Sequence, residues 1–171
     1  MGHMLMLTNG EPCEPDEPGC GEPNPVPGAD RLDYKMLKAL HVTAFDPALI
    51  RHNIKLELTG DMRRYTWSIN GKTMSHDSHI MVKYNEVVRF TLVNQTMMHH
   101  PMHLHGHFFR VLNGQDDKSP LMHTVDVGPM ETKTIEFHAN EPGIWMFHCH
   151  NLYHMKMGME RMVMYEGFKR P

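Results

Sequence analysis

The hydrophobic period of the chain changes near residue 53, and this change predicts most of its fold. Before that point, apolar side chains recur at helical spacing over residues 30–40, where Asp30 is suited to cap a short amphipathic helix. The apolar positions of this helix are Leu32, Met36, Leu37 and Leu40. After residue 53, short apolar runs with strand-like alternation take over, so we expect one short helix followed by an all-β domain.

The alternating part of the chain divides into short runs that are closed by turn signals. The predicted strands are residues 54–58, 64–69, 79–84, 87–93, 104–112, 121–127, 132–137, 143–148 and 161–165. Gly, Asn and Pro pairs separate several of them, for example Asn70-Gly71 and Asn113-Gly114. Many short strands with regularly spaced turns indicate an antiparallel Greek-key β-sandwich of seven to nine strands.

The first 29 residues differ from the rest in composition. They are rich in Pro, Gly and acidic residues and hold few large apolar side chains, so burial cannot offset the entropy of ordering them. We expect residues 1–29 to be an extended leader or linker, and residues 1–4 have the form of a cloning remnant. The remaining residues, 30–171, are long enough for one domain with its own core.

The three cysteines fall into two groups. Cys13 and Cys20 lie in the leader, whereas Cys149 stands among histidines. A disulfide between Cys13 and Cys20 would suit an oxidising compartment, and we expect a periplasmic location. Two unpaired thiols fit the same spacing equally well. The first ten residues lack the basic start and apolar run of a signal peptide.

Charge and composition narrow the function classes. A net charge of -3 gives no electrostatic reason to expect nucleic acid, and no apolar run approaches the roughly 18 residues of a membrane span. The unusual counts are 18 Met and 15 His. Thioethers and imidazoles bind soft and borderline metals, so the composition points to copper.

Both His-rich clusters, residues 97–107 and 147–159, lie at predicted strands. On a strand, successive side chains point to opposite faces, so His148 and His150 should face one way and Cys149 the other. On the Cys149 side, a turn would bring His154 and Met159 to the same point. His100 would supply a second imidazole, and two His with one Cys thiolate and a weak axial Met describe a blue-copper electron-transfer site.

The opposite face carries a different set of donors. His103 and His105 project together because Leu104 separates them, and they can meet His148 and His150. Four imidazoles without a carboxylate or thiolate suit copper ions that bind dioxygen.

Two motifs of the chain resemble the copper signatures in the C-terminal cupredoxin domain of multicopper oxidases. They are His100-Pro101-Met102-His103-Leu104-His105-Gly106 and His148-Cys149-His150 with His154 and Met159. Their Met-rich surroundings are most similar to those of the bacterial copper-resistance oxidases of the CopA/PcoA type, and the likeness covers residues 30–167. It implies a cupredoxin-like fold, copper as the cofactor, and an oxidoreductase with dioxygen as acceptor.

The resemblance also implies a role for each donor. His100, Cys149, His154 and Met159 would hold the type 1 copper. His103 would be a type 2 ligand, and the type 3 ligands would be His105, His148 and His150. A reductant such as Cu(I) or a phenol would deliver electrons, which Cys149 would pass to His148 and His150.

The chain departs from the family in one respect. In the family, another cupredoxin domain supplies four more histidines in two His-x-His motifs, and this sequence has no further pair of such motifs. We therefore expect the oxygen-reducing site to be completed by a missing N-terminal cupredoxin domain. Two alternatives stay open: a stand-alone cupredoxin that carries electrons or binds copper, and a homo-oligomer that pools histidines between two copies.

The remaining methionines have two interpretations. Those around the two signatures could form a docking surface for Cu(I), or they could fill the core between the sheets. Strand alternation favours core packing for Met162 and Met164, whereas Met155 and Met157 fit both interpretations.

Overall fold

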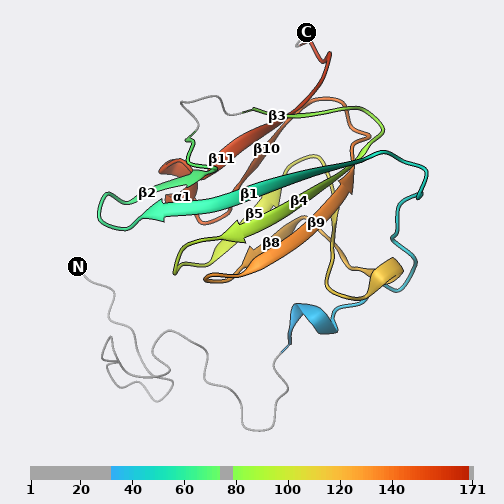
Figure 1. Cartoon of the computed structure of the whole chain (residues 1–171), viewed down its shortest axis with the longest axis horizontal. Coiled ribbons are helices and arrows are strands. Elements are labelled where there is room, and N and C mark those ends of the chain that lie inside the picture. Colours follow the sequence, from blue (N-terminus) through green and yellow to red (C-terminus); the bar gives the residue numbers. More distant parts are fainter. Residues whose placement is uncertain (1–31, 74–78, 170–171) are drawn as a thin grey trace. The chain divides into compact units, whose positions relative to one another are not determined.

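Most of the regular secondary structure in the described residues is β-strand (Figure 1). The computed structural model describes residues 32–73 and 79–169. The strands in this part are β1 Arg51–Asp61, β2 Thr66–Ile69, β3 His79–Val82, β4 Val87–Asn94, β5 His100–Leu104, β6 Phe109–Val111, β7 Leu121–Met122, β8 Thr124–Val127, β9 Thr132–His138, β10 Ile144–Cys149 and β11 Glu160–Tyr165. The helical elements are the α-helix α1 Leu152–Lys156 and two 3-10 turns, η1 Tyr34–Met36 and η2 Asp116–Lys118.

These strands form two sheets. One has the order β2-β1-β4-β9-β6-β7 and the other the order β3-β11-β10-β5-β8. Both are mixed, because β1 pairs in parallel with β4 and β11 pairs in parallel with β3. The predicted all-β sandwich is confirmed, but the expectation of purely antiparallel sheets with at most nine strands is wrong.

The core lies between the two sheets. Phe90 of β4 packs edge-on against Phe147 of β10, with ring centroids 5.3 Å apart, so the contact joins one sheet to the other. Leu58, Met102 and Val163 are fully buried in the same apolar cluster. Each of these residues has at least one exposed or half-buried neighbour along its strand, as the alternation of positions in the sequence predicts.

Several predicted turns and strands are present. Asn70 and Gly71 both have positive φ, 54° and 67°, which the tight turn after β2 requires. Seven of the predicted strands agree with β1, β2, β3, β4, β9, β10 and β11 to within a few residues.

Two predicted strands each divide between the sheets. The run 104–112 is interrupted at Gly106, where φ is +72° and a Cβ would lie 2.4 Å from the Trp145 ring. The chain therefore leaves β5 in one sheet and re-enters as β6 in the other. The run 121–127 divides in the same way at His123, between β7 and β8.

The predicted amphipathic helix over residues 30–40 is wrong for its described part. Only the three-residue turn η1 forms, and Leu32 and Leu40 are 73% and 88% exposed. A side chain from a distant loop occupies backbone carbonyls that would accept hydrogen bonds within a helix. The Asn113 amide donates to the carbonyls of Tyr34 and Leu37, at 2.6 and 2.7 Å. Tertiary hydrogen bonds thus replace the local ones.

Met162 and Met164 do not pack in the core. Along β11 the buried residues are Arg161, Val163 and Tyr165, and the two methionines are half-buried on the opposite, outer face. Strand alternation correctly predicts that Met162 and Met164 share one face of β11, but the buried face is the opposite one.

No helix in the described residues is long and apolar enough to cross a membrane. The predicted leader, with Cys13 and Cys20, lies outside the described residues.

Candidate metal centre

Three donor side chains converge at one end of the sandwich. His100 begins β5, Cys149 ends β10 and His154 lies in α1. The two imidazole Nδ1 atoms are 3.1 Å apart, and the Cys149 Sγ lies 3.8 Å from His100 Nδ1 and 3.6 Å from His154 Nδ1. All three side chains are completely buried. We refer to this set as the cysteine centre.

The backbone of Met159 joins the same region. Its N–H donates to the His154 carbonyl and its carbonyl accepts from the Cys149 N–H, both at 3.0 Å. The Met159 side chain is fully buried in the apolar cluster. All four residues that the sequence predicts for the electron-transfer site are therefore close together in the fold.

The short helix α1 places His154. The side chain of Asn151 caps it by accepting a hydrogen bond from the Tyr153 N–H at 3.2 Å. Gly158 follows with φ +116°, and a Cβ there would lie 2.5 Å from the Trp67 carbonyl oxygen. Only glycine fits this close approach, which returns the chain from the helix to β11.

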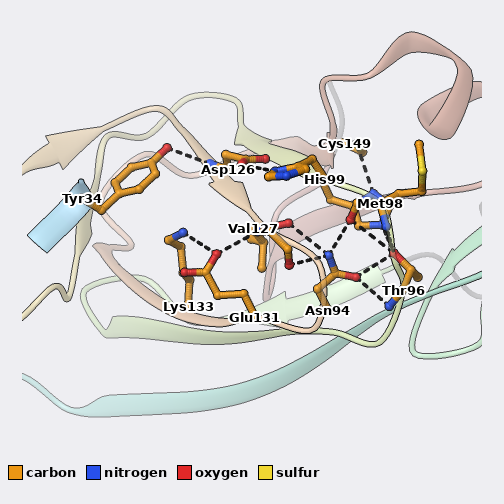
Figure 2. Close-up of polar contacts among 12 residues, drawn as sticks. Tyr34, Asn94, Thr96, Met98, His99, Asp126, Val127, Glu131, Lys133 and Cys149 are labelled. Atoms are coloured by element: carbon orange, nitrogen blue, oxygen red, sulfur yellow. Dashed lines mark hydrogen bonds and ion pairs between the residues drawn. The ribbon is translucent and has the colours of Figure 1, made fainter. Parts of the chain in front are cut away.

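His100 is oriented by two residues that the sequence does not predict for the site, Asn94 and Thr96, which Figure 2 shows with their hydrogen bonds. Asn94 is buried, and its amide donates to the carbonyls of Met98, Val127 and Gly128 at 2.7 to 3.1 Å. Its Oδ1 accepts from the Thr96 hydroxyl at 2.8 Å. Because that hydroxyl donates to Asn94, it accepts from Nε2–H of His100, 2.8 Å away. This fixes the tautomer that leaves Nδ1 of His100 free toward Cys149.

Aromatic side chains cover the cysteine centre on the side that faces the six-stranded sheet. The Trp67 ring of β2 lies 4.1 Å from the ring of His154 and 5.2 Å from the ring of His100, measured between centroids. Tyr65 contacts Trp67 edge-on at 5.8 Å. These rings come from β2 and the turn before it, almost 90 residues before His154, so the motif spacing could not reveal them.

Burial keeps these donors uncharged. It lowers the pKa of His100 to about 4, with smaller contributions from His154 and His99, and it lowers the pKa of His154 as well. It raises the pKa of the Cys149 thiol to about 11. The two imidazoles and the thiol offer three donor atoms within 4.8 Å of one another, a spacing at which one metal ion can bind all three. A thiolate with two imidazoles suits copper, whose binding would release the thiol proton.

A second group of imidazoles lies on the outer face of the same sheet. Nε2 of His105 is 3.1 Å from Nε2 of His148, and the His103 ring lies 4.7 and 5.5 Å from the rings of His105 and His148. These three side chains offer donor atoms within 4.8 Å of one another. His150 is further out, with its ring stacked 5.8 Å from that of His148. We refer to this set as the histidine centre.

Hydrogen bonds to carbonyl groups orient two members of the histidine centre. Nδ1–H of His103 donates to the His123 carbonyl at 2.6 Å, and Nδ1–H of His148 donates to the Cys149 carbonyl at 3.0 Å. Both rings thereby keep Nε2 free as a ligand atom. Burial lowers the pKa of His103, His105 and His148, so all three are neutral donors near pH 7.

The two centres differ in exposure. The cysteine centre is enclosed, whereas His105 and His150 are exposed and His103 is half-buried. Cys149 and its neighbour His148 are both buried but belong to different donor groups, as the opposite side-chain directions of successive strand residues predict. One peptide segment thus links an enclosed centre to an open one.

Four other described histidines make ordinary contacts. His107, within the first cluster, hydrogen-bonds the Tyr165 hydroxyl at 2.7 Å and has a structural role. His52, His99 and His138 pair with Glu86, Asp126 and Asn85.

Comparison with known proteins identifies the family. The multicopper oxidase family model matches residues 49–167. Copper resistance protein A from Escherichia coli is 42% identical over 113 residues, and one from Pseudomonas syringae pv. tomato is 38% identical over 153 residues. These matches cover 66% and 88% of this chain but 19% and 24% of the relatives. The chain therefore spans about a fifth to a quarter of their length.

Solved structures agree with this result. The multicopper oxidase McoA from Aquifex aeolicus superimposes with a TM-score of 0.59 at 27% identity, covering 73% of this chain and 31% of the other. A multicopper oxidase from Campylobacter jejuni, a metallo-oxidase, has a TM-score of 0.60 at 23% identity and shows the same fold. The sandwich is thus the cupredoxin fold predicted from the sequence. The chain belongs to the multicopper oxidase family, and copper is the metal that suits its two groups of donors.

Proposed function

We propose that this chain is the electron-accepting domain of a copper-resistance multicopper oxidase. His100, Cys149, His154 and Met159 would hold a type 1 copper, His103 a type 2 copper, and His105, His148 and His150 type 3 copper. When bound, copper supplies one-electron redox chemistry at the cysteine centre and dioxygen reduction at the histidine centre. Cu(I) or a phenol would be the reductant.

The observation that carries this proposal is the direct covalent link between the two centres. Cys149 is bonded through one peptide unit to His148 and through another to His150. Nδ1–H of His148 also donates to the Cys149 carbonyl at 3.0 Å. A simple electron carrier needs only the cysteine centre, so the adjacent open histidines favour an oxidase domain over a carrier.

The residues of this chain perform complementary tasks. The buried core and Trp67 exclude water from the cysteine centre, which keeps the thiol and imidazoles uncharged until a cation binds. The Thr96 hydroxyl and the His123 carbonyl orient His100 and His103. Exposed His105 and His150 leave the histidine centre open on one side, where a partner can add ligands.

We assign the missing ligands to an N-terminal cupredoxin domain. The chain spans 19% of the Escherichia coli relative, so other parts of such a protein can supply them. The described residues bring four histidines to the histidine centre, half of the eight that the resemblance implies. A periplasmic location would fit copper resistance and is tested by cell fractionation.

Copper titration of the purified chain tests the type 1 assignment. Cu(II) should produce an intense blue charge-transfer band, and Cys149→Ser should abolish it. The double change Cys13→Ser and Cys20→Ser removes the other two thiols and should leave the band intact. A band that survives in Cys149→Ser would refute the assignment.

Mass in solution and oxygen consumption test the partner assignment. The copper-loaded chain should be a monomer that consumes no oxygen with a phenol or Cu(I), and a partner domain should restore consumption. A dimer that consumes oxygen alone would instead support histidines pooled between two copies.

A further inference from the structure

Soft donor side chains gather on the outer face of the five-stranded sheet, and none of them is an assigned ligand of either centre. Met162 and Met164 of β11 point to this face and are half-buried, because Arg161, Val163 and Tyr165 occupy the core side. On β3 the same face carries His79 and Met81, which are both exposed.

Strand register places three of these donors in one row. Met146 of β10 is directly opposite Met162 of β11, and Met162 is directly opposite His79 of β3. A second row, displaced by two residues, joins Ile144, Met164 and Met81. The order β3-β11-β10 within the sheet makes β11 the immediate neighbour of both other strands.

The spacing of the row suits a single small ion. Neighbouring strands lie about 4.8 Å apart, so the central side chain of Met162 has a potential ligand on each side. Methionine is unbranched and flexible, so the two sulfur atoms can adjust toward a common point with the imidazole. Partial exposure leaves the row accessible to an ion from solvent.

The donor types select the ion. Two thioethers and one imidazole are soft to borderline ligands, and the row contains no carboxylate or carboxamide that would favour a hard cation. We propose that Met146, Met162 and His79 form a binding site for a monovalent soft cation, Cu(I), on the outer face of this sheet.

The site is continuous with the histidine centre. Met146 lies two residues before His148 on the same face of β10, and its carbonyl accepts a hydrogen bond from the His105 N–H at 2.9 Å. A cuprous ion held there would lie beside the imidazoles of the histidine centre. None of the residues in the row belongs to the cysteine centre, so the site stands independently of the type 1 assignment.

Anaerobic titration with Cu(I) against a chromophoric Cu(I) chelator tests the site on the 171-residue chain. Met162→Leu conserves volume and should preserve the fold, which an unchanged melting temperature would verify. We expect this variant to bind one equivalent of Cu(I) fewer, or to bind it at least tenfold more weakly. Met97→Leu removes an exposed thioether outside the row and should change neither quantity. If Met162→Leu keeps the full stoichiometry and affinity, the proposal is overturned.

Silver titration gives a second readout that does not depend on redox chemistry. Ag(I) added to the chain labelled with 13C at the methionine methyl groups should shift the signals of Met146 and Met162 first. His79→Gln should weaken this response. Shifts at Met97 with none at Met146 and Met162 would mean that exposed thioethers bind at random, which would also overturn the proposal. The blue band should persist in Met162→Leu, so failure here is distinct from failure of the type 1 assignment.

Discussion

The indole of Trp67 lies over the imidazole of His154, with ring centroids 4.1 Å apart and planes inclined by 36°. Trp67 belongs to β2 of the six-stranded sheet, and His154 belongs to the helix that connects β10 to β11 of the five-stranded sheet. This contact therefore closes the cysteine centre across the two layers. It also leaves His154 with no exposed edge.

Removing the Trp67 ring should destabilise the fold and open the centre. Trp67→Ala should lower the free energy of unfolding by about 3–5 kcal/mol, since a large buried side chain is lost. Urea unfolding measures the change. Tyr153→Ala, which alters an aromatic residue that is 71% exposed, should stay within about 0.5 kcal/mol. Equal effects of the two substitutions would contradict the assigned role of Trp67.

The hydrogen bond from His100 to Thr96 should set copper affinity at the cysteine centre. Thr96→Val keeps the shape of the side chain but removes the acceptor for Nε2–H of His100, so Cu(II) affinity should fall roughly 10–100-fold. Competition titration followed at the blue band gives the affinity. Thr96→Ser retains the hydroxyl and should bind copper nearly as tightly as the parent chain. A Thr96→Val variant with unchanged affinity would show that the ring is held by packing alone.

The copper-free chain should lose stability as the pH falls below about 6.5. Burial lowers the pKa of His100 to about 4, so the unfolded chain, with its ordinary histidine pKa near 6.5, binds more protons than the folded one between these values. The stabilisation is complete above pH 6.5 and is lost as the pH falls through about 4. The pKa values of His103, His105, His148 and His154 are lowered in the same direction.

Thermal unfolding at a series of pH values measures this dependence. His100 alone corresponds to about 3 kcal/mol. His100→Phe should flatten part of the curve between pH 4 and 6.5. An equally steep curve in that variant would assign the effect to other groups.

A buried carboxylate of the six-stranded sheet, Glu136, should contribute about as much to the free energy of unfolding as the Trp67 ring. Glu136 of β9 accepts hydrogen bonds from Arg89 at 2.9 and 3.1 Å and from Arg110, and both Glu136 and Arg110 are buried. Glu136→Gln leaves the two guanidinium groups uncompensated and should cost about 3–5 kcal/mol.

A matched exposed pair provides the control for this change. Lys55 and Glu57 form an ion pair at 2.7 Å on the surface of β1. Glu57→Gln should change the free energy of unfolding by less than about 1 kcal/mol in the same urea assay. A comparable loss in both variants would mean that burial does not distinguish the two ion pairs.

Much of the fold could be predicted from local pattern. Seven strands and the turn at Asn70 and Gly71 appear where alternation and turn residues indicate them. The errors lie where distant groups decide. The Asn113 side chain donates to a backbone carbonyl of the predicted helix, which does not form. Gly106 allows the chain to cross from one sheet to the other beside Trp145. Met162 shows that alternation defines two faces without saying which one is covered.

The sequence by itself determined that Cys149 and His148 belong to different donor groups, because successive side chains along a strand point to opposite sides. It also supplied the donors that the structure brings together at each centre. Only the tertiary structure decided what surrounds them. Thr96, Trp67 and the row from Met146 to His79 meet their neighbours through strand pairing and packing between residues far apart in the chain. Such contacts depend on the whole fold and leave no local periodic signal.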